Sequence, residues 1–118
     1  MIAGTGSGCG KTMVTLTVLR AMQRRNIPLA AFKCGPDYID PMFHKAVLGI
    51  PSRNLDLFFI SEREVRGQIV RSIPQNGIGV IEGVMGFYDG VSGTTDTASA
   101  AHLARETGTP AILVVRPK

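Results

Sequence analysis

The sequence lacks the features that mark several large classes of protein. Its 118 residues contain two cysteines, Cys9 and Cys34, which are too few for a disulfide framework and do not have zinc-site spacing. No run of apolar residues is long enough to span a membrane, and no signal peptide precedes the first motif. No repeat, low-complexity tract or linker interrupts the chain. We therefore expect one cytoplasmic domain with reduced thiols and no membrane partner.

The charge balance says little about partners. Thirteen lysines and arginines stand against nine aspartates and glutamates, which gives a net charge of +4, and the basic side chains are scattered over several segments. This balance suits a polyanionic small molecule, and a solvated basic surface without a ligand explains it at least as well. No nucleic-acid partner is predicted. With 44% hydrophobic residues, the chain can bury one core.

The first informative stretch is GTGSGCGKT at residues 4–12. The standard phosphate loop has a glycine, four residues and then Gly-Lys-Ser/Thr, and here Thr5 stands where that first glycine belongs. Counted from Gly4, the loop is one residue longer than the standard form. A flexible glycine-rich tail is the alternative, but this stretch follows an apolar run and opens a helical pattern from Lys11 to about Arg25.

A loop of this composition is suited to phosphate. Glycines allow consecutive N–H groups to turn inward around an anion, and the positive end of the following helix adds to the attraction. We predict that Lys11 reaches the terminal phosphates of ATP and that Thr12 binds magnesium (Mg²⁺). The residues predicted to bind the nucleotide are Gly4, Thr5, Gly6, Ser7, Gly8, Gly10, Lys11 and Thr12.

Short apolar runs alternate with helical patterns along the chain, which predicts an α/β fold with a parallel sheet. Ser61 and Glu64 match a capping box at the start of one helix, and Gly108 ends another that begins at about Thr97. The last apolar strand is expected to lack a neighbour on one side. The predicted strands cover residues 1–3, 29–34, 78–81 and 111–115.

The second informative stretch, FKCGPDYIDP, begins within the strand predicted at residues 29–34. Ligands of α/β sheets bind at such carboxyl ends. Pro41 makes Asp40 a good helix N-cap, which would be a purely structural role. Asp37 and Lys33 lie close by in the sequence, however, and two carboxylates and an ammonium beside a phosphate loop indicate metal and substrate handling.

The third stretch, GVIEGVMGFYDG, covers residues 79–90. An apolar strand that ends in an acid is typical of the metal-binding strand of phosphate-loop enzymes, here with Glu82 in place of the commoner aspartate. An exposed charge at the strand end is the alternative. We predict that Glu82 serves magnesium, and that the glycines at 83, 86 and 90 keep side chains away from a ligand.

Taken in order, the motifs GTGSGCGKT, FKCGPDYIDPMFH, PSRNLD and VIEGVMGFYDG resemble the amino-terminal, ATP-binding domain of the cobyrinic acid a,c-diamide synthase family. The resemblance covers nearly the whole chain. The long loop is shared with the more distant dethiobiotin synthetase, whereas GPDYIDP with VIEGVMG is specific to diamide synthases. The resemblance implies an α/β, parallel-sheet P-loop NTPase fold of the dethiobiotin synthetase type, present in incomplete form.

The resemblance also implies an activity. Enzymes of this family are ATP-dependent, glutamine-using ligases that amidate the a and c acetate side chains of cobyrinic acid, or of a related tetrapyrrole, through an acyl phosphate in cobalamin biosynthesis. In that scheme the catalytic residues are Lys33, Asp37 and Asp40, and the metal residues are Thr12, Asp37 and Glu82. Family motifs also cover the candidate substrate-binding residues Tyr38, Ser52, Arg53, Asn54 and Asp56.

Some positions depart from the family or have no predicted role. Gly6 and Cys9 stand where relatives commonly have other side chains, and Cys9 is assigned to packing in the loop. His44 and His102 are assigned to packing or solvation. The family continues into a glutaminase domain that supplies ammonia, so residues 1–118 are expected to be the first part of a synthetase domain that is inactive alone.

Two other functions stay open at this point. One is a partitioning-type ATPase that dimerises on ATP, although that class has a second lysine early in its loop, where this chain has Gly6. The other is a nucleotide-binding module without turnover that a partner chain completes. For a diamide synthase, the expected partners are a tetrapyrrole polycarboxylate, a glutaminase domain or chain and, as an open possibility, a second copy of the chain.

Overall fold

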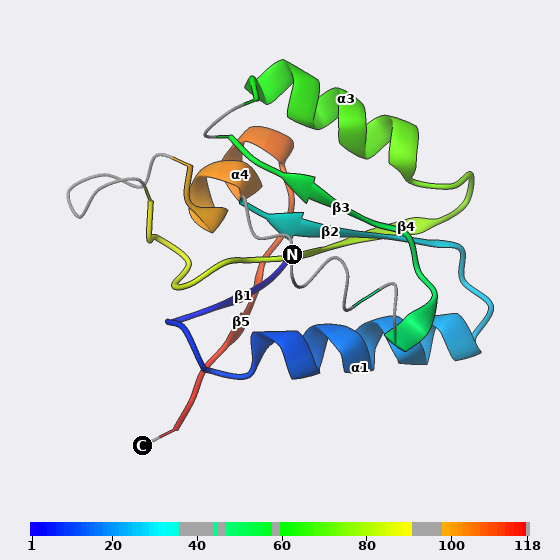
Figure 1. Cartoon of the computed structure of the whole chain (residues 1–118), viewed down its shortest axis with the longest axis horizontal. Coiled ribbons are helices and arrows are strands. Elements are labelled where there is room, and N and C mark those ends of the chain that lie inside the picture. The colour runs from blue at the N-terminus through cyan, green and yellow to red at the C-terminus, as the bar shows by residue number, and fades with distance from the viewer. Residues whose placement is uncertain (36–43, 45–46, 58–59, 91–97, 118) are drawn as a thin grey trace.

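The fold is a five-stranded parallel sheet with helices on both faces, seen in a computed structural model that describes residues 1–35, 44, 47–57, 60–90 and 98–117. The strand order is β3-β2-β4-β1-β5. Figure 1 shows α1 along one face of the sheet and α3 and α4 along the other. The strands are β1 (Ile2–Gly4), β2 (Leu29–Cys34), β3 (Ser52–Leu55), β4 (Ile78–Glu82) and β5 (Ile112–Val114), and the helices are α1 (Lys11–Arg24), α3 (Glu62–Ser72) and α4 (Ala100–Thr107).

Strand β2 shows how the sequence builds a sheet covered on both faces. Ala30, Phe32 and Cys34 pack into the core under α3 and α4, and Ala31 between them packs into the core against α1. Because side chains alternate across a strand, a strand buried on both faces is mainly apolar, and β2 is apolar at every position except Lys33. Burying a side chain such as Phe32 or Leu19 contributes about 1.5–3 kcal/mol relative to its exposure.

Parallel pairing brings the carboxyl ends of the strands to one edge of the sheet. β2 and β4 are aligned from Leu29 opposite Ile78 to Lys33 opposite Glu82. On the other side of β4, β1 pairs in parallel and ends at Gly4, where the glycine-rich loop begins. The described parts of the three informative stretches therefore converge at one edge of the sheet, which is where α/β sheets bind ligands.

The predicted elements are confirmed, with shifts at several ends. β2 has the predicted bounds, β4 runs one residue further to Glu82, and α1 ends at Arg24. The Ser61 cap is confirmed, because its hydroxyl accepts the Glu64 N–H at 3.2 Å. The start of α4 was predicted too early: Ser99 caps it by accepting the His102 N–H at 3.1 Å, so the helix begins at Ala100. Thr97 lies outside the described residues.

Of the two edge strands, β5 was predicted from the sequence and β3 was not. β3 was not predicted as a strand, because its sequence SRNL has no apolar run. It lies at one edge of the sheet and pairs in parallel with β2. β5 is strongly apolar, yet Ile112 and Leu113 are 63% and 51% exposed. β5 pairs with β1 and has no second neighbour in the described sheet, so the expected unpaired edge is confirmed. No described helix is both long and apolar enough to cross a membrane.

Candidate functional site

The glycine-rich loop joins β1 to α1 and takes backbone angles that favour glycine. Gly8 has φ +71° and Gly10, which is the N-cap of α1, has φ +99°. Gly10 offers no side chain, so no side-chain hydrogen bond caps the first turn of α1. Cβ atoms added at Gly6, Gly8 or Gly10 would meet no heavy atom within 4 Å, so the loop surrounds open space. Backbone N–H groups at such a helix end favour an anion.

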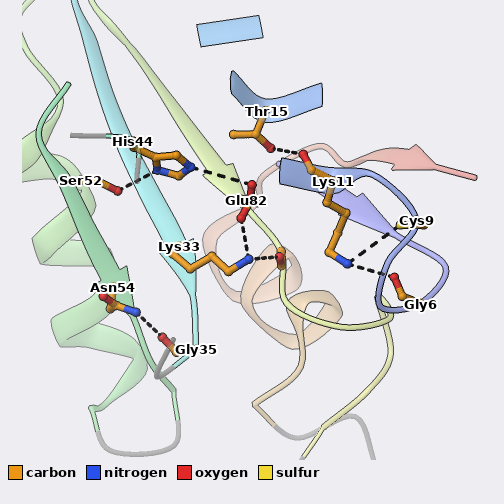
Figure 2. Close-up of polar contacts among 11 residues, drawn as sticks. Gly6, Cys9, Lys11, Thr15, Lys33, Gly35, His44, Ser52, Asn54 and Glu82 are labelled. Atoms are coloured by element: carbon orange, nitrogen blue, oxygen red, sulfur yellow. Dashed lines mark hydrogen bonds and ion pairs between the residues drawn. The ribbon is translucent and has the colours of Figure 1, made fainter. Parts of the chain in front are cut away.

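Lys11 folds back over the loop that precedes it. Its ammonium donates a hydrogen bond to the Gly6 carbonyl at 3.0 Å and lies 4.0 Å from the Cys9 sulfur, as Figure 2 shows. Gly4 allows this packing, because a Cβ at that position would lie 2.3 Å from the Cys9 sulfur. The packing assigned to Cys9 is therefore confirmed, and Gly4 acts as a spacer beneath the loop.

A cavity of about 480 Å³ opens beside the loop. Three regions of the chain meet around it: the loop with the start of α1, the end of β2, and the turn after β4. The lining residues are Ser7, Gly8, Gly10, Lys11, Thr12, Met13, Lys33, Val84 and Met85. The structure thus brings most of the predicted nucleotide-binding residues together with Lys33. Gly4 and Thr5 instead line a smaller neighbouring cavity of about 220 Å³ with Asp89.

Lys33 and Glu82 form a buried ion pair at the wall of this cavity. The Lys33 ammonium donates to Glu82 Oε2 at 2.6 Å and to the Gly83 carbonyl at 2.9 Å. The two side chains are only 3% and 0% exposed. Removing two charges from water is costly, and a close pair with added hydrogen bonds offsets that cost. Glu82 is therefore not the exposed strand-end charge of the alternative interpretation, and its magnesium role stays a prediction.

His44 belongs to the same polar cluster, although sequence analysis assigned it only to packing or solvation. It is fully buried, with Nδ1 3.1 Å from the Ser52 hydroxyl and Nε2 3.8 Å from Glu82 Oε1. Its assignment to packing is correct as far as burial goes, but it packs against the Lys33–Glu82 pair. Residue 44 has no periodic signal, and the pairing of β2 with β3 on one side and with β4 on the other brings Ser52, Lys33 and Glu82 together.

The candidate substrate-binding residues of β3 have contacts within the protein. Ser52 contacts His44, and the Asn54 amide donates to the Gly35 carbonyl at 2.8 Å. Asp56 is buried and Arg53 is exposed. None of these four lines the 480 Å³ cavity. Asp37, Tyr38 and Asp40 lie outside the described residues, so their predicted roles stay predictions.

The turn after β4 is fixed by hydrogen bonds from the protein itself. Gly83 N–H donates to the Ile2 carbonyl at 2.7 Å, and Gly86 N–H donates to Asp89 Oδ2 at 2.8 Å. A Cβ at Gly83 would meet Ala100 at 3.3 Å, and one at Gly86 would meet Asp89 at 2.8 Å. The surroundings of these two glycines are therefore protein rather than open ligand space, which differs from the predicted reason for them.

Cys34 is not a candidate nucleophile. Burial raises the pKa of its thiol to about 12, with a smaller opposing effect of Lys33 and a further increase from Asp56. At neutral pH the side chain is therefore a thiol, whereas nucleophilic attack needs the thiolate.

A second polar cluster joins α3 to α4 away from the loop. His102 Nε2 lies 3.2 Å from Glu62 Oε1, and this hydrogen bond is the largest of the effects that lower the pKa of the Glu62 carboxyl. Glu106 is close enough for the three side chains to share a cation. However, His102 Nδ1 already accepts the Ala98 N–H at 2.8 Å, so the proton of the neutral ring is on Nε2 and faces Glu62. The His102 ring therefore links the backbone just before α4, through the Ala98 N–H, to the Glu62 carboxylate on α3.

Comparison with known proteins identifies the family of the chain. Residues 1–102 match the family described as the CobQ/CobB/MinD/ParA nucleotide binding domain. The chain belongs to this family, and its parallel sheet and glycine-rich loop are those of a P-loop NTPase fold. The predicted fold class is thereby confirmed.

More specific similarity extends over the whole chain. It is 46% identical over 118 residues to the cobyrinate a,c-diamide synthase of Salmonella typhimurium, covering 100% of this chain and 26% of that protein. It is 43% identical over 115 residues to the synthase of the same name from Thermoplasma acidophilum, covering 98% of this chain and 26% of that protein. The resemblance to this group is confirmed, and the chain spans about a quarter of the length of these relatives.

Proposed function

We propose that this chain is the ATP-binding part of a ligase that amidates carboxylate side chains of a tetrapyrrole. The observation that carries the proposal is the meeting of Lys11, Lys33 and the uncapped start of α1 around one cavity at the carboxyl edge of the sheet. The Lys11 ammonium and the start of α1 bring positive potential to this space, and Lys33, whose charge is paired with Glu82, lies at its wall. The similarity to cobyrinate a,c-diamide synthases supports the choice of reaction.

The residues present fit a nucleotide with magnesium. The open space around Gly6, Gly8 and Gly10 accepts phosphate oxygens close to the backbone. Lys11 would exchange its contact with the Gly6 carbonyl for the terminal phosphates, and Thr12, which lines the cavity, would hold magnesium through its hydroxyl. Asp37 and Glu82 are the further metal residues of this proposal. When bound, magnesium would neutralise part of the negative charge on the phosphates.

The proposed reaction solves a chemical problem of carboxylates, which are poor electrophiles. A carboxylate oxygen of the substrate attacks the γ-phosphorus of ATP, so that an acyl phosphate forms and ADP leaves. Ammonia then attacks the acyl carbon, the amide forms, and inorganic phosphate leaves. Lys33 offsets charge that builds up during phosphoryl transfer, and Asp37 and Asp40 position the carboxylate. Tyr38, Ser52, Arg53, Asn54 and Asp56 are proposed to serve substrate binding.

The proposal also covers what this chain does not supply. The relatives are about four times as long, and we propose that residues 1–118 correspond to the first part of their synthetase domain. Ammonia comes from glutamine through a separate glutaminase domain or chain. The substrate is cobyrinic acid or a relative of it, and the chain alone forms no diamide product.

A chimera tests this function. The aligned first quarter of the Salmonella synthase is replaced by this chain, and the purified protein is incubated with cobyrinic acid, Mg-ATP and glutamine. We expect amidated product by mass, and no product from the same chimera with Lys11→Ala. An active chimera that tolerates Lys11→Ala would contradict the assignment of the loop. Product from the 118-residue chain alone would contradict its proposed dependence on the remaining domains.

A further inference from the structure

His44 is the buried polar side chain whose place in the structure is least explained by packing. It is fully buried, and its Nε2 has no hydrogen-bond partner among the described residues. Its other ring nitrogen, Nδ1, lies 3.1 Å from the Ser52 hydroxyl. Buried polar atoms are costly when they have no partner, so an apolar residue would serve packing better. The orientation of this ring needs another explanation.

The surroundings of the ring determine where its proton sits. Nε2 faces the carboxylate of Glu82, with 3.8 Å between Nε2 and Oε1. A lone pair on Nε2 would be repelled by that carboxylate, whereas an N–H is attracted to it. The neutral ring therefore carries its proton on Nε2, and Nδ1 accepts a hydrogen bond from the Ser52 hydroxyl.

These contacts continue to the cavity. In Figure 2 the polar contacts run from Ser52 through His44 and Glu82 to Lys33. Glu82 Oε1 faces the histidine, and Oε2 accepts from the Lys33 ammonium at 2.6 Å. Lys33 is the member of this series that lines the cavity beside the loop.

We propose that His44 is a positioning residue for Lys33. Ser52 fixes the tautomer of the ring, the Nε2–H dipole orients the Glu82 carboxylate, and Glu82 holds the Lys33 ammonium at the cavity wall. This inference rests on the proposed nucleotide site, because Lys33 has to meet a phosphate for its position to matter. It depends on a neutral ring of fixed tautomer and requires no change of protonation.

The proposal is specific about which ring atom matters. In His44→Gln the side-chain amide extends as far as Nε2 and keeps an N–H donor for Glu82. In His44→Asn the shorter amide corresponds to the Nδ1 side and reaches only Ser52. His44→Leu keeps a similar volume with no polar atom. If His44 only packs, the affinity of the variants should depend on side-chain volume. If it positions Lys33, the affinity should depend on whether a donor remains at the place of the Nε2–H.

The test is calorimetric titration of Mg-ATP into the wild-type chain and these three variants. We expect the Kd to rise about threefold to tenfold in His44→Leu and in His44→Asn, and to return to within about twofold of wild type in His44→Gln. In a Lys33→Met background, His44→Leu should cause no further loss, because the group that it positions is gone. Equal affinities for wild type and a folded His44→Leu would overturn the proposal.

Two features keep this test interpretable. If the wild type itself does not bind Mg-ATP, the proposed function has failed, and that result differs from a wild type that binds and a variant that binds equally. If His44→Leu does not fold, ¹⁵N NMR of the histidine ring in the unsubstituted chain decides the matter. A protonated Nε2 with an unprotonated Nδ1 is the expected spectrum, and the opposite tautomer would overturn the proposal.

Discussion

Lys11 and Lys33 line the same cavity, but the chain holds them in different ways. The Lys11 ammonium contacts the Gly6 carbonyl, five residues away in the sequence, and it belongs to a loop whose geometry depends on glycines. The Lys33 ammonium pairs with Glu82, 49 residues away, inside the sheet. A local loop thus supplies one positive charge, and long-range pairing of strands supplies the other. The contact of the first lysine is with a single backbone carbonyl, whereas the second lysine is held by a buried carboxylate and a backbone carbonyl.

The largest expected effect comes from breaking the long-range pair. Glu82→Leu leaves the buried Lys33 ammonium without its carboxylate, and we expect the free energy of unfolding to fall by about 3–5 kcal/mol. Urea denaturation followed by circular dichroism measures this. Adding Lys33→Met should recover most of the loss, because the charge that Glu82 compensated is then removed as well.

The exposed ion pair between Arg66 and Glu106 is the matched control. Its nitrogen and oxygen lie 3.7 Å apart, and both side chains are substantially solvated. Glu106→Leu should cost about 0–1 kcal/mol, as is usual for surface pairs. Similar losses from Glu82→Leu and Glu106→Leu would mean that burial does not distinguish the two pairs.

The next effect concerns the locally held lysine. Lys11→Ala should weaken Mg-ATP binding about tenfold or more, because a charge-assisted contact is worth roughly 1.5–3 kcal/mol. Its effect on the free energy of unfolding should be much smaller than that of Glu82→Leu, since Lys11 pairs with a backbone carbonyl. Arg20→Ala on the exposed side of α1 is the control and should leave affinity unchanged. Equal affinity of wild type and Lys11→Ala in calorimetry would remove Lys11 from the site.

A third prediction sharpens the description of the loop. Gly4→Ala places a Cβ 2.3 Å from the Cys9 sulfur, so we expect a loss of about 1–3 kcal/mol in the free energy of unfolding. Cys9→Ala should relieve that clash in the double variant. Gly6→Ala is the matched control, because its Cβ would meet no heavy atom within 4 Å. If Gly4→Ala and Gly6→Ala were equally stable in thermal unfolding, packing beneath the loop would not be the reason for Gly4.

The smallest expected effect is a difference in thiol reactivity between Cys9, which lies beside Lys11, and Cys34, which follows Lys33 in β2. Cys9 lies in the loop, half-buried beside Lys11, and Cys34 is buried next to Lys33. Burial raises the pKa of Cys34 from 9.0 to about 12, so iodoacetamide at pH 8 should label Cys9 and leave Cys34 unmodified, as mass spectrometry of peptides would show.

The sign of the pH dependence follows from that direction. Because the pKa of Cys34 is higher in the folded chain, its contribution to stability is fully present below pH 9 and is lost as the pH rises toward 12. The loss approaches about 1.4 kcal/mol per pH unit within that window. Cys34→Ala should flatten the profile between pH 9 and 12. An unchanged slope in that variant would assign the alkaline loss to other groups.

The same division between local and long-range structure explains what the sequence could predict. The loop, the bounds of β2 and the Ser61 cap depend on neighbouring residues, and each was predicted from its own pattern. β3 has no apolar run and becomes a strand only because β2 offers an edge to pair with. Local sequence patterns were therefore enough to predict the side of the cavity that the glycine-rich loop forms.

The side of the cavity at Lys33 depends on long-range contacts, which local sequence patterns do not reveal. Lys33 and Glu82 were each selected as site residues, but their pairing follows from the alignment of β2 with β4. His44 ends the motif FKCGPDYIDPMFH, but only its burial beside Glu82 and Ser52 gives it a place in the site. Lys33, Glu82 and Ser52 could each be predicted as site residues, but His44 and the geometry of the cluster could not.

The central claim is that the loop and Lys33 meet on one bound triphosphate. The most direct test is an NMR titration of the ¹⁵N-labelled chain with Mg-ATP, in which the amide signals of both regions are followed. We predict that the amides of Gly8, Gly10, Lys11 and Thr12 shift together with that of Lys33 and give one common Kd. Shifts limited to the loop, or different Kd values for the loop and Lys33, would contradict a single site built from both regions.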